Sequence, residues 1–358
     1  MDTFPVTARS LEPFFKKDGD KIERSYKDHL SGYRNWEQLS HADDWVLLSE
    51  NMGEHLSIDE TSLHDDLFTF LTNKDGHGKK GTMVAAVKGT RADHVINILM
   101  NIPEKQRLAV KEVTMDFSDS MYSIIKNVFP NAEIVIDCFH IIKRCGDAVE
   151  EIRLRSKRES VIEQRRQRAE HKKNLEKRSK QRKYYRKRHP KTYKGKKRGR
   201  KPARLNTRFK PEVLSNGDTV VELLTRGRCL LSMSRDKWSK SQKNRAELIF
   251  ERFPKIKEAY SMADKLRAIF RTKSNDRKQA ANKLKEWYQK VADCTLREVK
   301  SARDAIKFKE EEVLNYFNER ATNASAESFN SKIKRFRALL HGVSDLPFFL
   351  FRLIQIFG

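Results

Sequence analysis

The chain has 358 residues, of which 38% are hydrophobic and 35% charged, and its formal net charge is +26. This length suits two domains or one domain with an insertion, and no stretch approaches the roughly 20 apolar residues that a membrane span needs. The first residues, MDTFPVTARSLEPFF, lack the basic-then-apolar layout of a signal peptide, so we expect a cytoplasmic protein with no membrane partner.

Residues 1–50 indicate short helical pieces and loop, without a zinc pattern or a clear helix-turn-helix. From residue 54 the pattern changes to three short apolar runs, HLSIDETSL, LFTFLTN and TMVAAVKG, separated by turn-rich linkers. In the first run Leu56 and Ile58 alternate with Ser57 and Asp59, which is the period of a half-buried strand. The pattern predicts three strands joined as hairpins.

Helices and strands are expected to alternate over the next fifty residues. RADHVINILMNI and SMYSIIKNVF have helical spacing, and each is followed by an apolar run typical of a strand, KEVTMD and AEIVID. The expected order is three strands, helix, strand, helix, strand. In this order the first and fourth strands can lie side by side and parallel at the centre of one sheet.

Cysteines are too few and too scattered for a disulfide framework. The segment DCFHIIKRC brings Cys138, His140 and Cys145 close together in sequence, but a fourth ligand at a usual spacing is missing. We therefore expect buried, reduced thiols there rather than structural zinc.

Most of the net charge lies in one segment. Residues 151–210 contain 27 Lys and Arg against 5 Asp and Glu, a charge of +22, which leaves +4 for the other 298 residues. Such a segment repels itself unless it meets a polyanion whose counterions it displaces. We expect a charged helix over 151–188 and a disordered connector over 189–210, both able to bind DNA, which also implies association with the nucleoid.

Two details of this basic segment favour nucleic acid. Tyr184, Tyr185 and Tyr193 are interleaved with the bases and can stack on exposed nucleobases. The stretch RGRKP resembles short minor-groove hooks, with Arg198 and Arg200 as the arginines and Lys201 as a departure from the usual order.

The remainder of the chain is expected to be mostly helical. Residues 235–320 place apolar side chains every three or four positions, with a break at Pro254. ASAESFNSKIKRFRALLHG predicts a last helix in which Ser325 can be the N-cap and Gly342 can end it. At about 100° per residue, Phe329, Ile333, Phe336 and Leu340 form one stripe of this helix, while Glu327, Asn330, Lys334 and Arg337 gather on the opposite side.

Acidic residues end two of the predicted strands. Asp59 ends the first strand and Asp116 the fourth, and adjacent strands lie about 4.8 Å apart, so both carboxylates can share divalent ions such as Mg²⁺. Asp137 is a rival to Asp116 because it also ends a strand, and Glu60 is a weaker rival to Asp59. Glu327 can supply a third carboxylate from the last helix, although a first-turn Glu also complements a helix dipole.

Three blocks, SIDETS, VTMDFSDSMYSIIKNVFPNAEIVIDCFHIIK and NASAESFNSKIKRFRALLHG, resemble those of the DDE-type transposases of bacterial insertion sequences. They are most similar to the group called ISL-three, in the same order, and with the helical stretch after Trp238 the resemblance covers roughly residues 50–358. The middle block is the most specific of the three.

The resemblance implies an α/β fold, namely a ribonuclease-H-like mixed five-stranded sheet with flanking helices, interrupted by a basic, mostly helical insertion. It implies that Asp59, Asp116 and Glu327 are the catalytic triad and hold Mg²⁺ or Mn²⁺ for DNA cleavage and strand transfer. Double-stranded DNA, as transposon ends and target, is the implied substrate. A homodimer or a higher synaptic complex is implied because two ends must be held together.

Ten further residues are expected to contact DNA. They are His140, Arg198, Arg200, Lys201, Trp238, Asn330, Lys332, Lys334, Arg335 and Arg337. Two alternatives stay open: His140 can instead pack beneath the sheet, and Trp238 can instead belong to a core. Lys334, seven residues after Glu327, matches the basic position that contacts the transposon end in this group.

The expected division is an N-terminal helical or linker segment (1–50), the first part of the catalytic domain (51–150), the insertion (151–310) and C-terminal helices that complete the catalytic domain (311–358). Relatives usually begin with a module that reads the transposon ends, and nothing before residue 50 resembles one. Either the basic segment takes this role or a separate end-binding protein does. Two alternatives to a transposase are a nuclease of the same fold and a non-catalytic nucleic-acid-binding protein, such as a decayed transposase.

Overall fold

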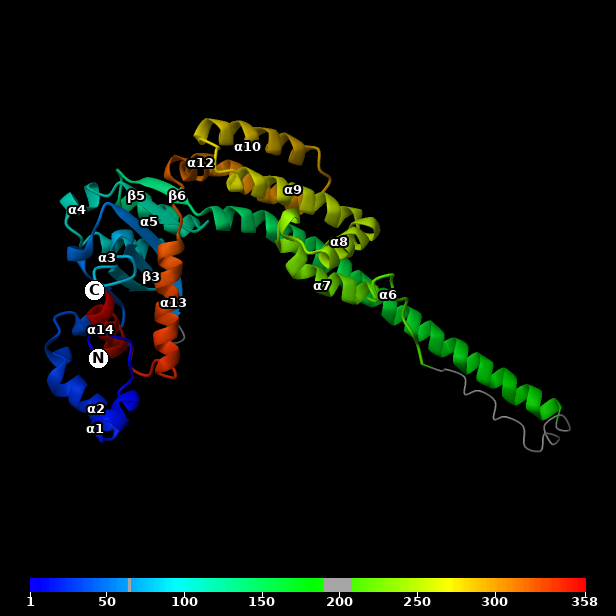
Figure 1. Ribbon diagram of the computed structural model, residues 1–358, viewed down its shortest axis with the longest axis horizontal. Helices are drawn as coiled ribbons and strands as arrows, with labels where there is room; N and C mark the ends of the chain where they lie inside the picture. The colour runs from blue at the N-terminus through cyan, green and yellow to red at the C-terminus, as the bar shows by residue number, and fades with distance from the viewer. Residues whose placement is uncertain (64–65, 190–207) are drawn as a thin grey trace. The chain divides into compact units, whose positions relative to one another are not determined.

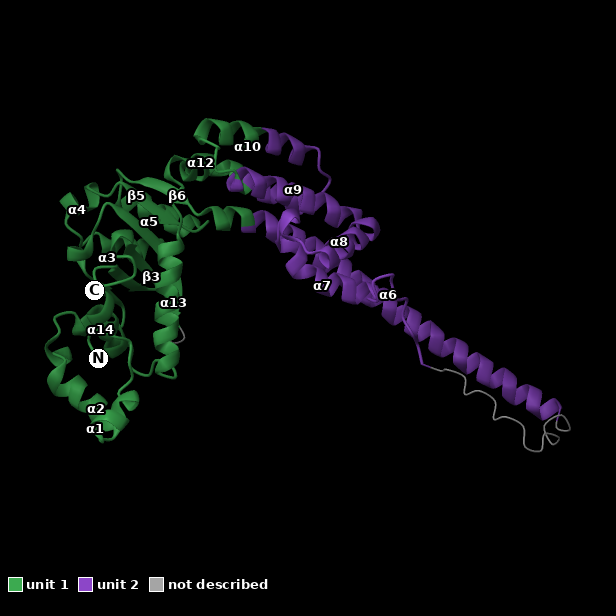
Figure 2. Ribbon diagram, viewed as in Figure 1, with its two compact units in different colours: residues 1–142, 272–285, 305–358 green, residues 143–271, 286–304 purple. Residues whose placement is uncertain are grey.

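The computed structural model describes residues 1–63, 66–189 and 208–358, and the fold is drawn in Figure 1. The chain divides into two compact units, which Figure 2 distinguishes by colour. Unit 1 contains residues 1–142, 272–285 and 305–358, and unit 2 contains residues 143–271 and 286–304. The domain boundaries expected from the sequence remain a prediction.

A six-stranded mixed sheet forms the centre of unit 1, in the order β1-β4-β3-β2-β5-β6. Its strands are β1 (Trp45–Leu47), β2 (His55–Leu63), β3 (Asp66–Asn73), β4 (Met83–Lys88), β5 (Glu112–Met115) and β6 (Glu133–Ile136). Strands β1, β4, β3 and β2 pair antiparallel, whereas β2, β5 and β6 pair parallel. The predicted neighbourhood of the first and fourth expected strands, β2 and β5, is confirmed.

The prediction of five strands was wrong by one. The extra strand, β1, lies in the segment expected to contain only helical pieces and loop, and it pairs with β4 at the edge of the sheet. Its three residues are too short to show an alternating pattern, but Val46 is fully buried and belongs to the core. Tertiary packing therefore decides this strand, rather than local pattern.

The N-terminal residues otherwise form short elements. They are the 3-10 turns at Arg9–Leu11, Tyr33–Asn35, Leu39–His41 and Ser49–Asn51, helices α1 (Glu12–Phe15) and α2 (Gly19–Ser25), and a π-helical turn at Tyr26–Leu30. Tyr33 packs edge to face on Phe348 and Phe351 of the last helix, with ring centroids 5.2 and 5.4 Å apart. These contacts attach the N-terminal segment to the end of the chain.

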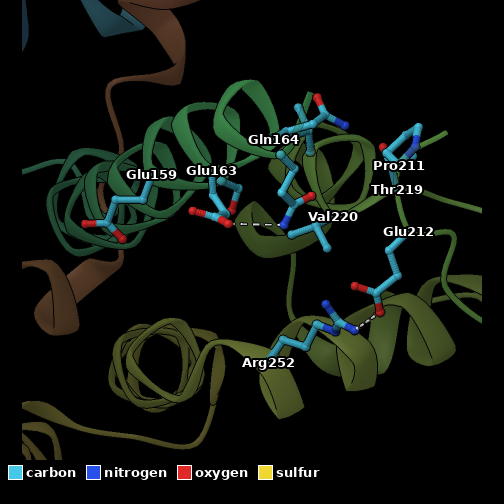
Figure 3. A pocket seen from close by; sticks show the side chains of 11 residues that line it. Glu159, Glu163, Gln164, Pro211, Glu212, Thr219, Val220 and Arg252 are labelled. Atoms are coloured by element: carbon cyan, nitrogen blue, oxygen red, sulfur yellow. Dashed lines mark hydrogen bonds and ion pairs between the residues drawn. The ribbon is translucent and has the colours of Figure 1, made fainter. Parts of the chain in front are cut away.

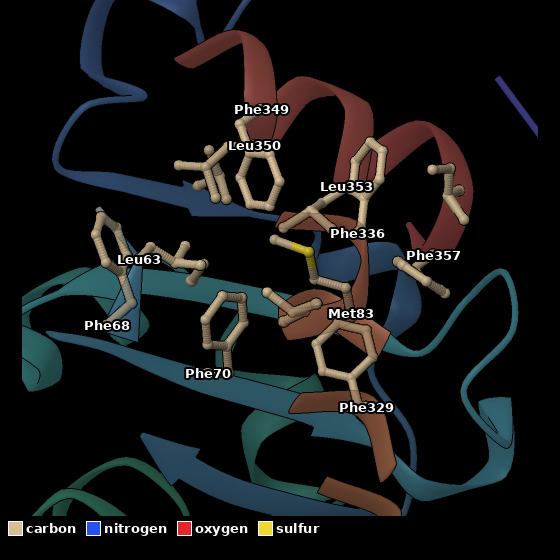
Figure 4. Packing of buried hydrophobic residues seen from close by; sticks show 14 of the residues in the cluster. Leu63, Phe68, Phe70, Met83, Phe329, Phe336, Phe349, Leu350, Leu353 and Phe357 are labelled. Atoms are coloured by element: carbon tan, nitrogen blue, oxygen red, sulfur yellow. The ribbon is translucent and has the colours of Figure 1, made fainter. Parts of the chain in front are cut away.

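Helices α13 (Ala324–Leu339) and α14 (Leu346–Phe357) cover one face of the sheet (Figure 4). Phe329, Ile333 and Phe336 of α13 are fully buried, as their predicted stripe requires, and they pack with Phe70 of β3 and Met83 of β4. Burying such side chains contributes roughly 1.5–3 kcal/mol each. The apolar stripe thus fixes α13 against this face of the sheet.

The termini of α13 differ in detail from the expectation. Asn323, rather than Ser325, precedes the helix, and no side chain caps its N-terminus. At the other end His341 takes the left-handed conformation (φ 56°) and donates its N–H to Ala338, while Gly342 donates to Arg337. These two bonds form a Schellman motif, so the glycine ends the helix one residue later than the left-handed position.

The other helices of unit 1 support the parallel strands. They are α3 (Ala92–Leu99), α4 (Glu104–Leu108), α5 (Asp119–Val128) and α12 (Glu310–Glu319). Helix α12 packs on β6, where Asn315 Nδ2 donates to the Ile134 carbonyl at 2.8 Å. This bond satisfies part of the outer edge of the sheet.

Unit 2 is helical within its described residues. Its elements include most of α6 (Cys138–Arg188), α7 (Val220–Ser232), α8 (Lys240–Arg252) and α9 (Pro254–Arg271), together with parts of α10 (Arg277–Ala292) and α11 (Arg297–Phe308). Pro254 begins α9, so the predicted break at this residue is confirmed. Asp218, 1% exposed, pairs with Arg226 and with Arg245 (3.2 Å) and holds the start of α7 against α8.

Candidate active site

Three aspartates occupy equivalent positions on the three parallel strands. Ser57 pairs with Thr114 where β2 meets β5, so Asp59 and Asp116 each lie two residues further along their strands. On β6 the pairing of Met115 with Ile136 places Asp137 beside Asp116. Because in-register side chains of neighbouring parallel strands point to the same face, the three carboxyl groups lie in a row.

Asp59 is the most perturbed of these acids. Its Oδ2 accepts a hydrogen bond from Asn330 Nδ2 at 2.6 Å, and its Oδ1 accepts the Glu60 N–H at 2.7 Å. Burial, followed by the charge of Asp116, raises the pKa of Asp59 to about 6. Burial and the same charge also raise the pKa of Glu60. Asp59 and Asp116 are therefore close enough to oppose each other's ionisation.

Asp116 receives two donors on the same oxygen. His140 Nε2 lies 3.1 Å from Asp116 Oδ1, and Asn323 Nδ2 lies 3.1 Å from the same atom. His140 stands in the first turn of α6, directly after β6, with its side chain 21% exposed. Both the histidine and the asparagine thus orient the Asp116 carboxylate.

Asp137 uses its carboxylate for the fold. It precedes α6, and its Oδ1 accepts the Phe139 N–H at 2.8 Å, which is the contact of a helix N-cap. Its Oδ2 accepts the N–H of Asn323 at 2.8 Å, and the residue is only 4% exposed. This carboxylate therefore joins the start of α6 to the residue before α13.

Asn323 connects all three strands and was not expected from the sequence. It is fully buried, and besides Asp116 and Asp137 it contacts the Ile58 carbonyl and Thr114 Oγ1, both at 3.4 Å. Thr114 in turn lies 2.7 Å from Ser57 Oγ beneath the acids. The sequence feature that could have predicted this role is its position four residues, or about one helical turn, before Glu327.

Glu327 occupies the first turn of α13 and is exposed. It stands one turn before Asn330, so both lie on the side of the helix that meets Asp59. In the described part of the chain, no three His, Cys, Asp or Glu side chains form a ready metal-binding group. Glu327 is thus exposed at the start of α13, and the predicted meeting of three carboxylates is not formed among the described residues.

The donor set nevertheless suits a hard divalent cation. Asp59 and Asp116 offer carboxylate oxygens, the ligands that Mg²⁺ prefers, and their mutual repulsion would be relieved by positive charge. Asn330 adds a buried side-chain oxygen that has no hydrogen-bond partner in the described residues. A cation held here would act as a Lewis acid on a phosphoryl oxygen.

Basic side chains of α13 border this site. Lys334 and Arg335 are exposed, whereas Lys332 Nζ donates to the Gly78 carbonyl at 2.5 Å and Arg337 donates to the Ser62 carbonyl at 3.2 Å. All four follow the turn that carries Glu327 and Asn330. A phosphate backbone at the acids would therefore meet positive charge along the same helix.

The remaining expected DNA contacts lie in unit 2 or outside the described residues. Trp238 is 8% exposed, its Nε1 donates to the Leu230 carbonyl at 2.9 Å, and its ring lies 5.1 Å from Tyr260. This environment is that of a core tryptophan. The expected contacts Arg198, Arg200 and Lys201, and the stacking residue Tyr193, lie outside the described residues.

Unit 2 also contains a pocket of about 340 Å³ beside α6 (Figure 3). Glu159, Glu163 and Glu212 line it, and Arg252 pairs with Glu212 at 2.5 Å. It contains none of the acids of the parallel strands. All four cysteines are free thiols; Cys145 is buried as expected, whereas Cys138 is only partly buried.

The mixed sheet carries acidic residues, and helix α13, which covers one face of it, carries basic residues. This combination is typical of enzymes that act on a polyanion. Comparison with protein families gives its class: a family model described as "Transposase" matches residues 56–206 and 186–353. The chain belongs to the ISL-three group of DDE transposases. DNA is accordingly its substrate, and DNA cleavage and rejoining is its general activity.

No curated protein and no solved structure matches the chain. Among the helices of the described ranges, none has the length and apolar character that crossing a bilayer requires.

Proposed function

We propose that the chain cleaves DNA and transfers the cut strand by a DDE mechanism, on a ribonuclease-H-like domain whose catalytic residues are Asp59, Asp116 and Glu327. One observation carries this proposal. Asp59 and Asp116 hold equivalent positions on adjacent parallel strands, and α13, which carries Glu327, packs against them through Asn330. Glu327 would join the two aspartates when a bound divalent cation supplies the positive charge that attracts it.

The cofactor of this proposal is Mg²⁺ or Mn²⁺, held by the same three carboxylates. Asp59, Asp116 and Glu327 would hold the cations, which would supply Lewis-acid chemistry for phosphoryl transfer. The protein's own residues position the groups: Asn330 and the Glu60 N–H orient Asp59, and His140 and Asn323 orient Asp116. Small displacements of such ligands cost catalysis, which favours rigid strands as their support.

Asp116 is preferred to Asp137 as the second ligand. Both oxygens of Asp137 accept backbone N–H groups, from Phe139 and Asn323. Moving Asp137 toward a cation would break the N-cap of α6 and leave a buried N–H without its partner. The contacts of Asp116 with His140 and Asn323 come from side chains, which can turn with the carboxylate.

The DNA-binding part of the proposal includes the basic residues of α13 and the basic arm of α6, which is residues 161–188. Transposon ends and target DNA would lie along Lys332, Lys334, Arg335 and Arg337, with His140 at the acids. Arg198, Arg200 and Lys201 would contact the DNA backbone or minor groove. Trp238 would contact DNA only if its packing against Phe250 and Tyr260 rearranged.

Assembly follows from the chemistry, since two transposon ends must be held at once. We propose a homodimer or higher synaptic complex, with end recognition supplied by the basic arm or by a separate end-binding protein.

The test compares four single variants with wild type. Asp59→Ala, Asp116→Ala and Glu327→Ala should each abolish Mg²⁺-dependent cleavage of a transposon-end duplex while DNA affinity stays within about threefold. Asp93→Ala is the matched control, an exposed aspartate of α3, and should cleave as wild type does. Full activity in Asp116→Ala would reject the assignment. Transfer of a pre-cleaved end into a plasmid separates a transposase from a nuclease of the same fold.

A further inference from the structure

Asn330 has an environment that its exposed neighbours on α13 do not share. It is 4% exposed, in the middle turns of the helix, and its Nδ2 donates to Asp59 Oδ2 at 2.6 Å. Ser331 beside it is exposed, and Lys334, one turn later, is exposed as well. A side chain expected to contact DNA is therefore enclosed against the first acid instead.

The other half of the Asn330 amide is not satisfied. Its Oδ1 is buried and has no hydrogen-bond partner within the described part of the chain. Buried polar atoms are nearly always paired, so an orphaned acceptor beside two carboxylates needs an explanation. Reversing the amide does not remove the difficulty, because it would place the amide oxygen against Asp59 Oδ2 and orphan the donor instead.

The hydrogen-bond donors closest to the two aspartates already have acceptors, so they do not serve the Asn330 oxygen. The donors that the structure gives to the acids are already committed, with His140 and Asn323 on Asp116 and the Glu60 N–H on Asp59. Within the described residues no donor reaches the Asn330 oxygen, and a bound water can supply the hydrogen bond. A hydrated divalent cation meets this need, because Mg²⁺ keeps several of its waters when carboxylates bind it.

We propose that Asn330 is a positioning residue of the metal site, which rests on the proposed function. Its amide nitrogen fixes the orientation of the Asp59 carboxylate, and its side-chain oxygen accepts a hydrogen bond from a water of the bound cation. Residues that orient metal ligands in this way typically change metal affinity 10- to 100-fold when they are replaced.

Mn²⁺ binding to the full chain, measured by electron paramagnetic resonance without DNA, tests this role. Asn330→Leu keeps the volume but removes both polar atoms, and it should weaken Mn²⁺ binding at least about tenfold. Asn330→Asp keeps an acceptor and adds charge, so it should bind Mn²⁺ at least as tightly as wild type. Asn127→Leu, at an exposed position of α5, is the control and should bind as wild type does.

Thermal unfolding without metal separates this role from a structural one. Asn330→Asp should unfold at a lower temperature than wild type, because it adds a third carboxyl group to Asp59 and Asp116, although its Mn²⁺ affinity is retained. A purely structural role predicts that affinity follows stability in both variants, and that result would overturn the proposal. So would unchanged Mn²⁺ affinity in Asn330→Leu.

Failure of the proposed function has a different signature. If wild type binds no Mn²⁺, or if Asp116→Asn leaves Mn²⁺ binding unchanged, the proposed metal site is absent. The proposed role of Asn330 is then rejected as well. If wild type binds Mn²⁺ and Asn330→Leu binds equally well, only the role of Asn330 is rejected.

Discussion

At the scale of single residues, the same chemical group performs different tasks at equivalent positions. Asp59, Asp116 and Asp137 share one row across three strands, yet their partners differ. Asp137 accepts backbone N–H groups on both oxygens, whereas Asp116 meets a histidine and a side-chain amide, and Asp59 accepts one side-chain amide and one backbone N–H. The partner set, more than the position, distinguishes a structural carboxylate from one that can receive a cation.

Asp137→Ala should lower the free energy of unfolding by about 2–4 kcal/mol. The variant loses the N-cap of α6 and leaves the Asn323 N–H buried without its acceptor. Urea denaturation followed by circular dichroism measures the change. The exposed Asp93→Ala serves as reference and should change stability by less than about 0.5 kcal/mol. Equal stability of the two variants would show that Asp137 does not hold this junction.

Asp59→Asn should stabilise the metal-free protein at neutral pH. The folded-state pKa of Asp59 is raised to about 6 by burial and by Asp116, so ionising Asp59 costs stability as pH rises from about 4 to 6. The variant avoids this cost, and its advantage should be absent below pH 4 and reach about 3 kcal/mol above pH 6. His140, which favours the ionised form, and Glu60 face the same group.

Thermal melts between pH 4 and pH 8, in the presence of a chelator, measure this advantage. An advantage that is equal at pH 4 and pH 7 would contradict the assigned cause. Adding Mg²⁺ should reduce the advantage, because the cation stabilises ionised Asp59 only in wild type.

At the scale of elements, period and turn chemistry predicted most of unit 1. The segment HLSIDETSL became β2 over the same nine residues, and the expected order from β2 to β6 is confirmed except for the short helix α4, which was not expected. These elements are buried on alternating or helical faces, so their patterns are strong. Strand β1 was missed because three residues cannot display a period, and Ser325 was wrongly expected as the cap of α13.

The candidate site divides in the same way. Strand ends and strand order were enough to bring Asp59 and Asp116 together, since adjacent parallel strands fix their neighbourhood. The bonds of Asn323 and Asn330 join residues more than 180 positions apart in sequence. The sequence pattern could not predict these contacts. The apolar stripe of α13 shows which face of the helix is buried, but it does not show which polar side chain meets which strand.

Phe336→Ala should destabilise the protein by about 3–5 kcal/mol. The ring is fully buried between α13 and α14, stacked at 5.3 Å on Phe349 (Figure 4), and its removal leaves a cavity. Chemical denaturation gives the magnitude. Its exposed neighbour provides the control, because Arg335→Ala removes no packing and should change stability by less than about 0.5 kcal/mol. A loss below 1 kcal/mol for Phe336→Ala would mean that α13 is not anchored by this face.

At the scale of the whole molecule, the candidate catalytic acids and the main concentration of basic residues lie in different parts of the chain. The described residues 161–188 of α6 contain 13 Lys and Arg against 3 Asp and Glu, and none of them is buried. A helix that buries no side in unit 2 gains little from packing there, so its bases remain available to phosphates. In unit 1, by contrast, Asp137 is buried, and Asp59 and Asp116 are partly buried.

Replacing the 13 Lys and Arg of residues 161–188 with Gln should weaken DNA binding and flatten its dependence on salt. Each lost phosphate contact reduces the slope of log affinity against log salt by about 0.9. Fluorescence anisotropy with a labelled duplex between 50 and 200 mM salt, a range over which such contacts change affinity strongly, provides the slope. An unchanged slope would show that this arm does not grip the DNA backbone. Folding of the variant is checked by its Mn²⁺ affinity, which should equal that of wild type.

The matched spacing of Asp59 and Asp116 beyond the last paired residues has a consequence for how such a chain can change in length. Consecutive side chains of a strand point to opposite sides, so one residue added before either acid would turn its carboxylate into the apolar interior that holds Leu56 and Ile58. The fold can accommodate substitutions near Asp59 and Asp116, but it cannot accommodate the insertion or deletion of one residue before either acid without reversing the side to which the carboxylate points. Large additions are tolerated only where the chain has already left the strands, and the 51-residue helix that begins at Cys138 starts at the first such point after the third aspartate.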